Sequence, residues 1–380
     1  MTVVNPSRSH GIYHNPSAAS WSHQPPTTSN PLILKFHQRL PEYKQTPLVP
    51  LPDLAKELGV SHVLVKDEST RFGLPSFKIL GASWAIYCAV AAQCGLDATV
   101  DPPISITSLG DAARQSGIHL VTCSDGNWGR ATARMARYLG IPATVFVPQN
   151  IDDATQVRIR SEGATVGVVE GNYDDSIATA KEEAERTGAL LVMDTSWAGF
   201  TEVSSWVVEG YSTALEEVDQ QLVQLTGDKP PTCIIGSVGV GSWMQSVTAH
   251  FKAKNPPCTV ATVEPETSAC LKASLEAGKM TTIRTGDTIM CGMNCGTVSE
   301  IAWPVLRNGV DAAVAISDWD SHRAVQYLHG RGVNAGPCGA ASVSALRMLK
   351  DEGKLELGAD AVVVLLSTEG YREYNIPPEA

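Results

Sequence analysis

The stretch that decides the fold reads Lys66-Asp67-Glu68-Ser69-Thr70-Arg71-Phe72-Gly73-Leu74-Pro75-Ser76-Phe77-Lys78. It leaves an apolar run of strand length, His62 to Val65, crosses a Gly/Pro loop and opens a helical stretch, Phe77 to Gln93. Lys78 therefore falls in the first turn of that helix. The positive end of the helix dipole disfavours an ammonium there, so a partly desolvated lysine is easier to keep neutral for Schiff-base chemistry. Taken alone, a lysine at this position is far more often a solvated surface residue, and Ser76 is equally well explained as a helix cap.

Short apolar runs alternate with helical stretches along the rest of the chain. The expected strands are His62 to Val65, His119 to Thr122, Ala143 to Val147, Ala164 to Val169, Leu190 to Met193, Thr232 to Ser237, Thr259 to Val263, Ala312 to Ile316 and Ala361 to Leu366. The expected helices are Phe77 to Gln93, Gly129 to Leu139, Asp174 to Thr187, Glu202 to Leu225, Ser242 to Lys254 and Gly339 to Lys350. Because the strand runs are nearly all apolar, both faces of each sheet should be covered. We expect an α/β protein with two three-layer αβα domains and mostly parallel sheets.

Composition narrows the class of function. The chain has 380 residues, 43% of them hydrophobic, and a formal net charge of -11. Nucleic acid and anionic membrane surfaces are bound by clustered Lys and Arg, so neither is an expected partner. Uncharged apolar runs such as Ala361 to Leu366 are far shorter than the roughly 20 residues of a membrane span. A small-molecule substrate and a cytoplasmic location are the expectations.

The cysteines indicate a reducing compartment. There are 9, an odd number, with no Cys-x-x-Cys pair and no clustered histidines. That pattern is neither a disulfide framework nor a set of metal ligands, so no metal is expected. Cys291 and Cys295 stand four apart, and we interpret them as small, partly buried residues.

A second loop, Ser124-Asp125-Gly126-Asn127-Trp128-Gly129-Arg130, lies between an expected strand and an expected helix. Its glycines let the backbone approach a ligand closely, and the Asn127 amide can donate to a ring hydroxyl or a carboxylate. As a bare pattern it is also an ordinary strand-to-helix turn.

A third loop, Gly236-Ser237-Val238-Gly239-Val240-Gly241-Ser242, is rich in glycine and precedes a helix. Exposed amides, the Ser242 hydroxyl and the helix N-terminus together would cradle a phosphate. A dinucleotide fingerprint needs glycine where Met244 stands, and a P-loop needs Gly-Lys-Ser/Thr, which is missing. A compact phosphate fits, and glycines needed only for tight packing are the alternative.

The fourth stretch, Leu365-Leu366-Ser367-Thr368-Glu369-Gly370, ends the last apolar strand. Ligands of open parallel sheets bind at the carboxyl ends of strands, where Ser367 and Thr368 would lie. A hydroxyl there can pair with a pyridine nitrogen without protonating it, although a Ser-Thr pair after a strand is more often a turn cap.

The order of the four stretches is that of the fold-type II enzymes that use pyridoxal 5'-phosphate (PLP), the tryptophan synthase β and threonine dehydratase type. In detail the chain resembles the 2,3-diaminopropionate ammonia-lyase family, whose Lys-Asp-Glu-Ser-x-Arg-Phe-Gly-Leu-x-x-Phe-Lys motif is matched from Lys66 to Lys78. Further matches are Asp125-Gly126-Asn127, Asp194-Thr195 with Trp197 and Gly199, Val263-Glu264-Pro265, Cys291-Gly292 with Cys295-Gly296, and Ser367-Thr368-Glu369-Gly370. The resemblance runs from about residue 35 to the end.

The resemblance implies PLP as cofactor. It implies that Lys78 forms the Schiff base and removes the α-proton of the L-substrate. The implied cofactor-binding residues are Lys78, Phe77, Asn127 for the 3-hydroxyl, Gly236, Val238, Gly239, Val240, Gly241 and Ser242 for the phosphate, and Ser367 or Thr368 for the pyridine nitrogen.

The implied reaction is α,β-elimination of 2,3-diaminopropionate, which gives pyruvate and ammonia. In the family, the position of Asp125 faces the substrate amino groups and serves as base toward the D-isomer, and Asp194 matches a second acidic position. A carboxylate beside the β-position pairs with an ammonium, which serine and threonine lack. From the residues alone, Asp125 is also explained as a helix cap.

Three departures from the family pattern leave rival functions open. Trp128 stands where histidine is frequent, Ala198 where an acidic residue is familiar, and Ser242-Trp243 replaces small residues. A reshaped pocket would suit a serine/threonine dehydratase or a β-substitution synthase. A non-catalytic alternative is a PLP-binding regulator or a degenerate paralogue, which predicts a broken lysine or phosphate loop.

We expect an N-terminal arm or disordered tail over 1–35. A large PLP-binding domain is expected over 36–84 and 204–380, and a small substrate domain over 85–203, with PLP between them. Homodimers are usual in families of this resemblance.

Overall fold

The computed structural model describes residues 10–23, 30–124, 126–149, 151–171 and 173–379. The chain divides into two compact units. Unit 1 comprises the described parts of Met1–Ser29, Gln45–Phe77 and Ala214–Ala380, and unit 2 comprises Asn30–Lys44 and Lys78–Thr213. The boundary falls between Phe77 and Lys78, so Lys78 opens unit 2. The range 85–203 that we expected as a small domain lies inside unit 2.

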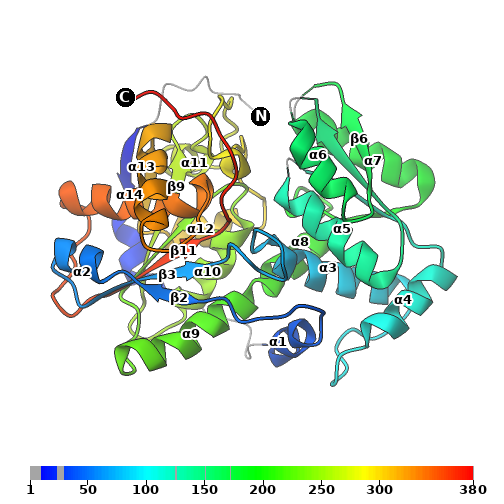
Figure 1. Cartoon of the computed structure of the whole chain (residues 1–380), viewed down its shortest axis with the longest axis horizontal. Helices are drawn as coiled ribbons and strands as arrows, with labels where there is room; N and C mark the ends of the chain where they lie inside the picture. The colour runs from blue at the N-terminus through cyan, green and yellow to red at the C-terminus, as the bar shows by residue number, and fades with distance from the viewer. Residues whose placement is uncertain (1–9, 24–29, 125, 150, 172, 380) are drawn as a thin grey trace. The chain divides into compact units, whose positions relative to one another are not determined.

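Unit 1 contains a seven-stranded sheet in the order β1-β10-β9-β8-β11-β3-β2 (Figure 1). Its strands are β1 (Gly11–His14), β2 (Leu48–Pro50), β3 (His62–Asp67), β8 (Cys233–Ser237), β9 (Thr259–Pro265), β10 (Ala312–Ile316) and β11 (Val362–Ser367). The five inner strands are parallel, and only the edge strands β1 and β2 pair antiparallel. The five strands expected here from apolar runs are confirmed.

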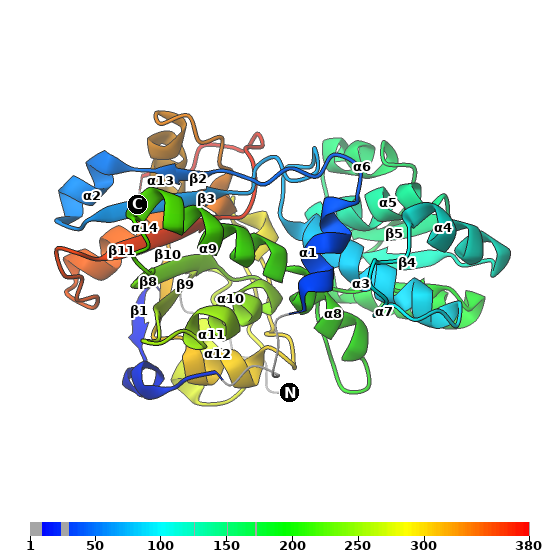
Figure 2. The same ribbon diagram turned by 90° about the horizontal axis from the view of Figure 1, so that it is seen from below.

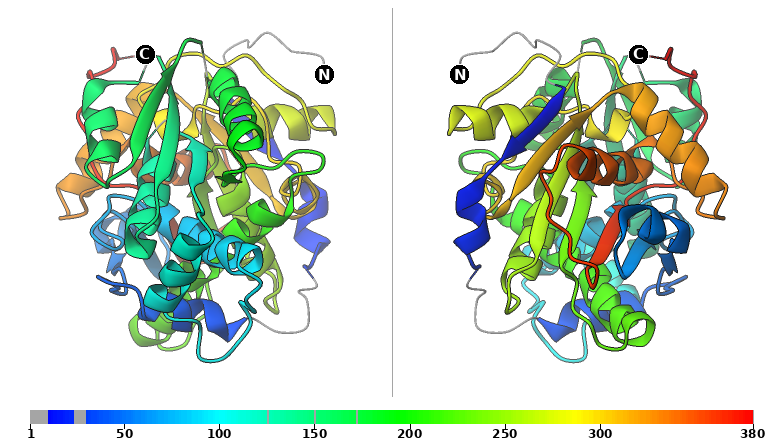
Figure 3. Two further views of the ribbon diagram at one scale, coloured as in Figure 1. Left: turned by 90° about the vertical axis from the view of Figure 1, so that its right-hand side faces the viewer. Right: turned by 90° about the vertical axis from the view of Figure 1, so that its left-hand side faces the viewer.

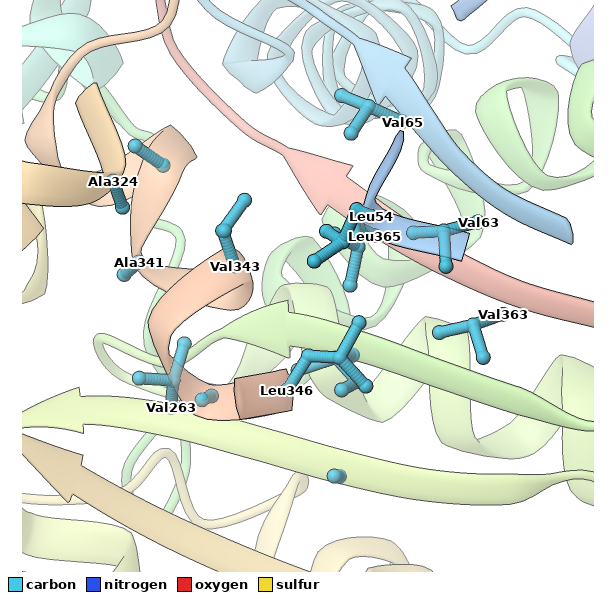
Figure 4. Close-up of a cluster of buried hydrophobic side chains, with 14 of the residues drawn as sticks. Leu54, Val63, Val65, Val263, Ala324, Ala341, Val343, Leu346, Val363 and Leu365 are labelled. Carbon is cyan, nitrogen blue, oxygen red and sulfur yellow. The ribbon is translucent and has the colours of Figure 1, made fainter. Parts of the chain in front are cut away.

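Helices cover both faces of this sheet. They are α2 (Pro52–Leu58), α9 (Ser212–Thr226, which begins in unit 2), α10 (Ser242–Lys252), α11 (Cys270–Ala277), α12 (Trp303–Gly309), α13 (Asp318–His329) and α14 (Pro337–Asp351), with short 3-10 turns at Pro16–Ser20 and Cys291–Met293. Figure 2 shows α10 and α12 side by side. Because side chains alternate along a strand, Val363 and Leu365 face the cluster with Leu346 of α14 (Figure 4), whereas Gly236 faces Met244 of α10. This is the expected three-layer arrangement.

The expected N-terminal arm contains an edge strand. β1 pairs with β10 from Gly11↔Ala315 to His14↔Ala312, and the two lie side by side in the right-hand view of Figure 3. The Asn15 amide then donates to the carbonyls of Arg307 (3.0 Å) and Val310 (3.1 Å). A four-residue strand at the edge of a sheet is too short to show an apolar pattern from which it could be predicted.

Unit 2 contains a parallel four-stranded sheet in the order β6-β5-β4-β7. The strands are β4 (Leu120–Cys123), β5 (Ala143–Pro148), β6 (Thr165–Val169) and β7 (Leu190–Leu191). The helices are α1 (Pro31–Gln38), α3 (Lys78–Gln93), α4 (Ile106–Gln115), α5 (Asn127–Leu139), α6 (Asp153–Arg160), α7 (Tyr173–Thr187) and α8 (Glu202–Gly210). Val121 and Cys123 pack against α7, while Thr122 on the opposite face receives a hydrogen bond from Trp128 of α5.

The prediction of a single helix from Glu202 to Leu225 is wrong, because the helix is interrupted between α8 and α9. Gly210, at the end of α8, touches α3 closely: a Cβ placed there would lie 2.5 Å from the Leu80 carbonyl oxygen. Packing of α8 on α3 therefore sets this break, and a helical period along one segment cannot predict it. In the part of the chain that the structure describes, no helix is long and apolar enough to cross a membrane.

Candidate active site

Lys78 is the first residue of α3, as the sequence predicted, and its Nζ forms an ion pair with the carboxylate of Asp194. Asp194 lies just beyond β7, at the carboxyl end of the unit 2 sheet. The Asp194 side chain is 5% exposed and that of Lys78 22% exposed, so the carboxylate is buried and the amine is partly open to solvent. The Asp194 carboxylate stabilises positive charge on the amine, whereas the helix dipole and the partial desolvation expected from the sequence favour the neutral amine.

Tyr211 is a residue of this region that the sequence did not indicate. Its ring is fully buried and presses on Gly81, where a Cβ would lie 2.6 Å from Cε1 and 2.7 Å from Cζ. Gly81 follows Lys78 by three residues and therefore lies on the same face of the helix. Burial raises the pKa of the Tyr211 hydroxyl, which is therefore neutral at physiological pH. Gly81 itself was the available signal, since glycine inside an apolar helix marks close packing.

The second loop leads into α5, whose first residue is Asn127. The Ser124 hydroxyl accepts from the backbone N–H groups of Gly126 (2.9 Å) and Gly129 (2.8 Å), so Ser124 ties this loop to the start of the helix. Asn127 is partly exposed at the helix N-terminus. The Asp125 prediction lies outside the described residues.

Two of the three departures have a structural explanation. Trp128 is buried, and its indole N–H donates to Thr122 Oγ1 (2.9 Å), so Trp128 is a packing residue. Ala198 is exposed in a turn closed by the rings of Trp197 and Phe200, whose centroids are 4.5 Å apart.

The glycine-rich loop joins β8 to α10 in unit 1. Two of its carbonyls are turned to neighbouring elements: Val240 O accepts from the Ser299 N–H (2.7 Å) and Gly239 O from the Cys270 thiol (3.6 Å). Among the described residues, the N–H groups of Gly239, Val240 and Gly241 have no hydrogen-bond acceptor. These N–H groups directly precede the N-terminus of α10, which is the arrangement that the sequence predicts for a phosphate site.

Other members of the same loop serve packing. The Val238 N–H donates to the Val263 carbonyl (3.0 Å) and so extends the sheet pairing. A Cβ on Gly236 would lie 2.6 Å from Met244 Sδ, and Gly241 has φ +96°. The sequence left open whether this loop packs tightly or binds a phosphate, and its residues divide between the two: Gly236 and Val238 pack against neighbouring elements, whereas the N–H groups of the three residues after Val238 have no acceptor among the described residues.

Ser367 ends β11, and its hydroxyl is buried without a hydrogen-bond partner among the described residues. Gly339 of α14 stands directly against it, since a Cβ there would lie 2.7 Å from Ser367 Oγ. A buried polar atom left unpaired costs about 1–3 kcal/mol, so it marks a place where a ligand atom is expected. Of the two hydroxyls predicted at the end of β11, that of Ser367 is the buried one that is unpaired among the described residues.

Phe77 and Thr368 lie side by side. The Phe77 N–H donates to the Thr368 carbonyl (3.3 Å), and the Phe77 ring packs on Trp243 of α10 with centroids 4.7 Å apart. Trp243, the third departure, thus contacts a predicted cofactor residue. Lys78 follows Phe77 directly in the chain.

The candidates form two sets, each within one unit. Unit 1 holds Phe77, the loop 236–242, Ser367 and Thr368, and unit 2 holds Lys78, Asn127 and Asp194. No group of His, Cys, Asp and Glu that could hold a metal ion occurs within the described ranges, and all nine cysteines are free thiols.

Comparison with known proteins identifies the class. The family described as pyridoxal-phosphate-dependent enzyme matches residues 40–369. The chain therefore belongs to the pyridoxal-phosphate-dependent enzymes. It is 34% identical over 360 residues to a diaminopropionate ammonia-lyase of Salmonella typhimurium, covering 89% of this chain and 88% of that protein. The resemblance to the diaminopropionate ammonia-lyase family is thus confirmed.

A solved structure supports the same grouping. The diaminopropionate ammonia-lyase of Escherichia coli in complex with an aminoacrylate-PLP azomethine reaction intermediate superposes with a TM-score of 0.85 at 29% identity, over 96% of this chain and 94% of that one. A more distant relative is the L-serine dehydratase/L-threonine deaminase of Bos taurus, 28% identical over 336 residues, with 86% of this chain and 91% of that protein covered. The fold-type II prediction is confirmed.

Proposed function

We propose that this protein is a PLP-dependent ammonia-lyase that converts 2,3-diaminopropionate and water into pyruvate and two molecules of ammonia. The observation that carries the proposal is the Lys78–Asp194 pair in a chain that is 34% identical to a diaminopropionate ammonia-lyase over 360 residues. A regulator or degenerate paralogue would be expected to have lost the lysine or the phosphate loop, and both are intact.

The residues of unit 1 fit the cofactor. The N–H groups of Gly239, Val240 and Gly241 and the N-terminus of α10 would bind its phosphate, and the unpartnered Ser367 hydroxyl would pair with its ring nitrogen. Asn127 of unit 2 would donate to its 3-hydroxyl, and Lys78 would attach it covalently. When bound, PLP withdraws electrons from the substrate Cα, so that the α-proton and then the β-amino group can leave.

Lys78 and Asp194 would move the protons. The Lys78 amine takes the α-proton from the L-substrate and becomes an ammonium, a charge that the buried Asp194 carboxylate stabilises. Asp125 is proposed to pair with the β-ammonium of the substrate and to act as base toward the D-isomer. This pairing is the basis for preferring diaminopropionate over serine.

A substrate panel on purified, PLP-loaded protein tests the proposal. Pyruvate and ammonia are measured from L- and D-diaminopropionate, L-serine and L-threonine. We expect two ammonia per pyruvate from diaminopropionate and a higher kcat/KM for it than for either hydroxy amino acid. Turnover of serine or threonine without release of ammonia from diaminopropionate would contradict the proposed substrate and favour the dehydratase function.

We propose that unit 1, which contains most of 36–84 and 204–380, is the PLP-binding domain, and that unit 2, which contains 85–203, is the substrate domain. We further propose a homodimer in the cytoplasm, where nine free thiols are stable. Light scattering coupled to size exclusion measures the oligomeric state.

A further inference from the structure

Four charged side chains of unit 1 are buried together outside the candidate active site. Lys66 is the penultimate residue of β3, Glu68 and Arg71 follow this strand in the loop 68–77, and Glu217 lies on α9. All four are at most 1% exposed. Two positive and two negative charges make this group, which we name the buried quartet, neutral. Charges removed from water this completely persist only when they are paired with good geometry.

The pairing within the buried quartet is nearly complete. Arg71 meets both oxygens of Glu217 (Nη1–Oε1 and Nη2–Oε2, 2.7 Å each) and both oxygens of Glu68 (Nη2–Oε1 2.6 Å, Nε–Oε2 2.7 Å). Lys66 Nζ lies 2.7 Å from Glu217 Oε2. Burial alone would raise the pKa of Glu217, but the Arg71 guanidinium beside it lowers this pKa to about 2, so the carboxylate is charged. Bidentate arginine pairs of this kind fix position as well as charge.

The loop that carries Glu68 and Arg71 lies along the end of β11. The Glu68 N–H donates to the carbonyl of Ser367 (2.9 Å), the Gly370 N–H to that of Pro75 (2.8 Å), and the Phe77 N–H to that of Thr368 (3.3 Å). One end of the loop is thus bonded to the residue proposed to meet the ring nitrogen. Its other end is the residue that precedes Lys78.

The loop is also strained next to Arg71. Phe72 is fully buried and has φ +52°, a left-handed conformation that is unfavourable for a residue with a side chain. Such a conformation persists only where the surroundings hold it. The five hydrogen bonds or ion pairs from the neighbouring Arg71 supply that restraint.

We propose that Arg71 and Glu217 are positioning residues for the reaction: the buried quartet anchors the loop 68–77 to α9 and so sets Ser367 at one end of the loop and Phe77 with Lys78 at the other. The inference rests on the proposed cofactor site. It assigns a purpose to Lys66, Glu68 and Arg71 of the Lys66–Lys78 motif, which are all buried. Glu217, outside that motif, is the partner that they require.

The test compares two variants of the PLP-loaded protein. Glu217→Gln removes one charge from the buried quartet. Asp311→Asn is the matched control, because Lys252 and Asp311 form another buried lysine–carboxylate pair of unit 1 (2.8 Å, with Lys252 1% exposed) that holds the N-terminal segment. Each variant leaves a buried lysine without its full counter-charge, so both should lower stability.

Three measurements separate positioning from stability. Hydrogen exchange of the 68–77 peptide and the circular dichroism of the bound cofactor should change in Glu217→Gln and stay at the wild-type level in Asp311→Asn. On whichever amino acid the wild type eliminates, kcat should fall at least about tenfold in Glu217→Gln, since displacement of a reacting group by about 1 Å costs on the order of a hundredfold. KM should change less than kcat.

The result that would overturn the inference is a Glu217→Gln protein with wild-type exchange in 68–77 and a wild-type cofactor signal. Equal changes of both signals in the two variants would also overturn it, because the effect would then be one of stability only. If Glu217→Gln does not fold, Arg71→Lys, which keeps the charge and loses the planar fork, is measured in its place with the same expectations. Exchange and dichroism need no substrate, so failure of the proposed substrate leaves this test intact.

Discussion

Ser367→Ala should have opposite effects on the cofactor-free protein and on cofactor binding. The Ser367 hydroxyl is buried and has no hydrogen-bond partner within the described residues, and the side chain is 1% exposed. An unsatisfied buried hydroxyl costs about 1–3 kcal/mol, whereas removal of one oxygen opens very little space. The free energy of unfolding of the cofactor-free variant should therefore equal or exceed that of the wild type, by up to about 2 kcal/mol.

The same change should weaken the bound state. With the hydroxyl gone, the pyridine nitrogen loses its proposed partner in a closed site, and the Kd for PLP should rise by roughly tenfold, the equivalent of about 1.4 kcal/mol. Urea unfolding of the cofactor-free proteins and absorbance titration with PLP measure the two effects.

Ser321→Ala is the matched control. Its hydroxyl is equally buried but donates to the Pro337 carbonyl (2.9 Å), so its loss should destabilise the protein by about 1–3 kcal/mol with little effect on PLP affinity. The reasoning is refuted if Ser367→Ala destabilises the cofactor-free protein as much as Ser321→Ala does, because the Ser367 hydroxyl would then have a partner in the protein.

Three further predictions concern α3, the ion pair and pH. Gly81→Ala would place a methyl group 2.6 Å from the Tyr211 ring. The free energy of unfolding, measured by urea denaturation, should therefore fall by about 1–3 kcal/mol. An unchanged value would show that α3 and α8 can move apart at little cost. Asp194→Asn removes the carboxylate that pairs with Lys78, and kcat should fall about 10²- to 10⁴-fold in a pyruvate assay; wild-type turnover would exclude Asp194 from the mechanism. Burial raises the pKa of Glu264 to about 7, well above the ordinary value for a glutamate, despite hydrogen bonds from two backbone N–H groups. The folded state therefore keeps this proton to higher pH than the unfolded state, and stability should decrease by roughly 3 kcal/mol as pH rises from about 4.5 to 7. The free energy of unfolding of the wild type should be lower at pH 8 than at pH 5 by about this amount, and the difference should be smaller in Glu264→Gln. An equal difference in the two proteins would contradict the raised pKa of Glu264.

The sequence predicted the fold to the extent that the fold depends on local pattern. Apolar runs marked the parallel strands because both faces of these sheets are covered, and the four chemical stretches follow strands or open helices as expected. The edge strand Gly11–His14 was missed because it is too short to show an apolar pattern. The break between α8 and α9 was missed because contact of Gly210 with α3 determines it.

The sequence indicated candidate residues for the site but not the partners of the buried ones. The motif from Lys66 to Lys78 was recognisable, but the burial of Arg71 against Glu217 joins residues 146 positions apart, and no spacing rule indicates such a pair. Trp128 left two interpretations open because the sequence does not show which face of α5 it occupies. The hydrogen bond from its indole to Thr122 resolves that question in favour of packing.

The central claim is that Lys78 carries the cofactor. Borohydride reduction of the PLP-loaded protein fixes a Schiff base as a stable bond, and peptide mass spectrometry then locates it. We expect a visible band at ~410 to 420 nm that is lost on reduction, a pyridoxyl group on Lys78, and no labelled lysine in Lys78→Ala. A pyridoxyl group on another lysine, or full labelling in Lys78→Ala, would contradict the account.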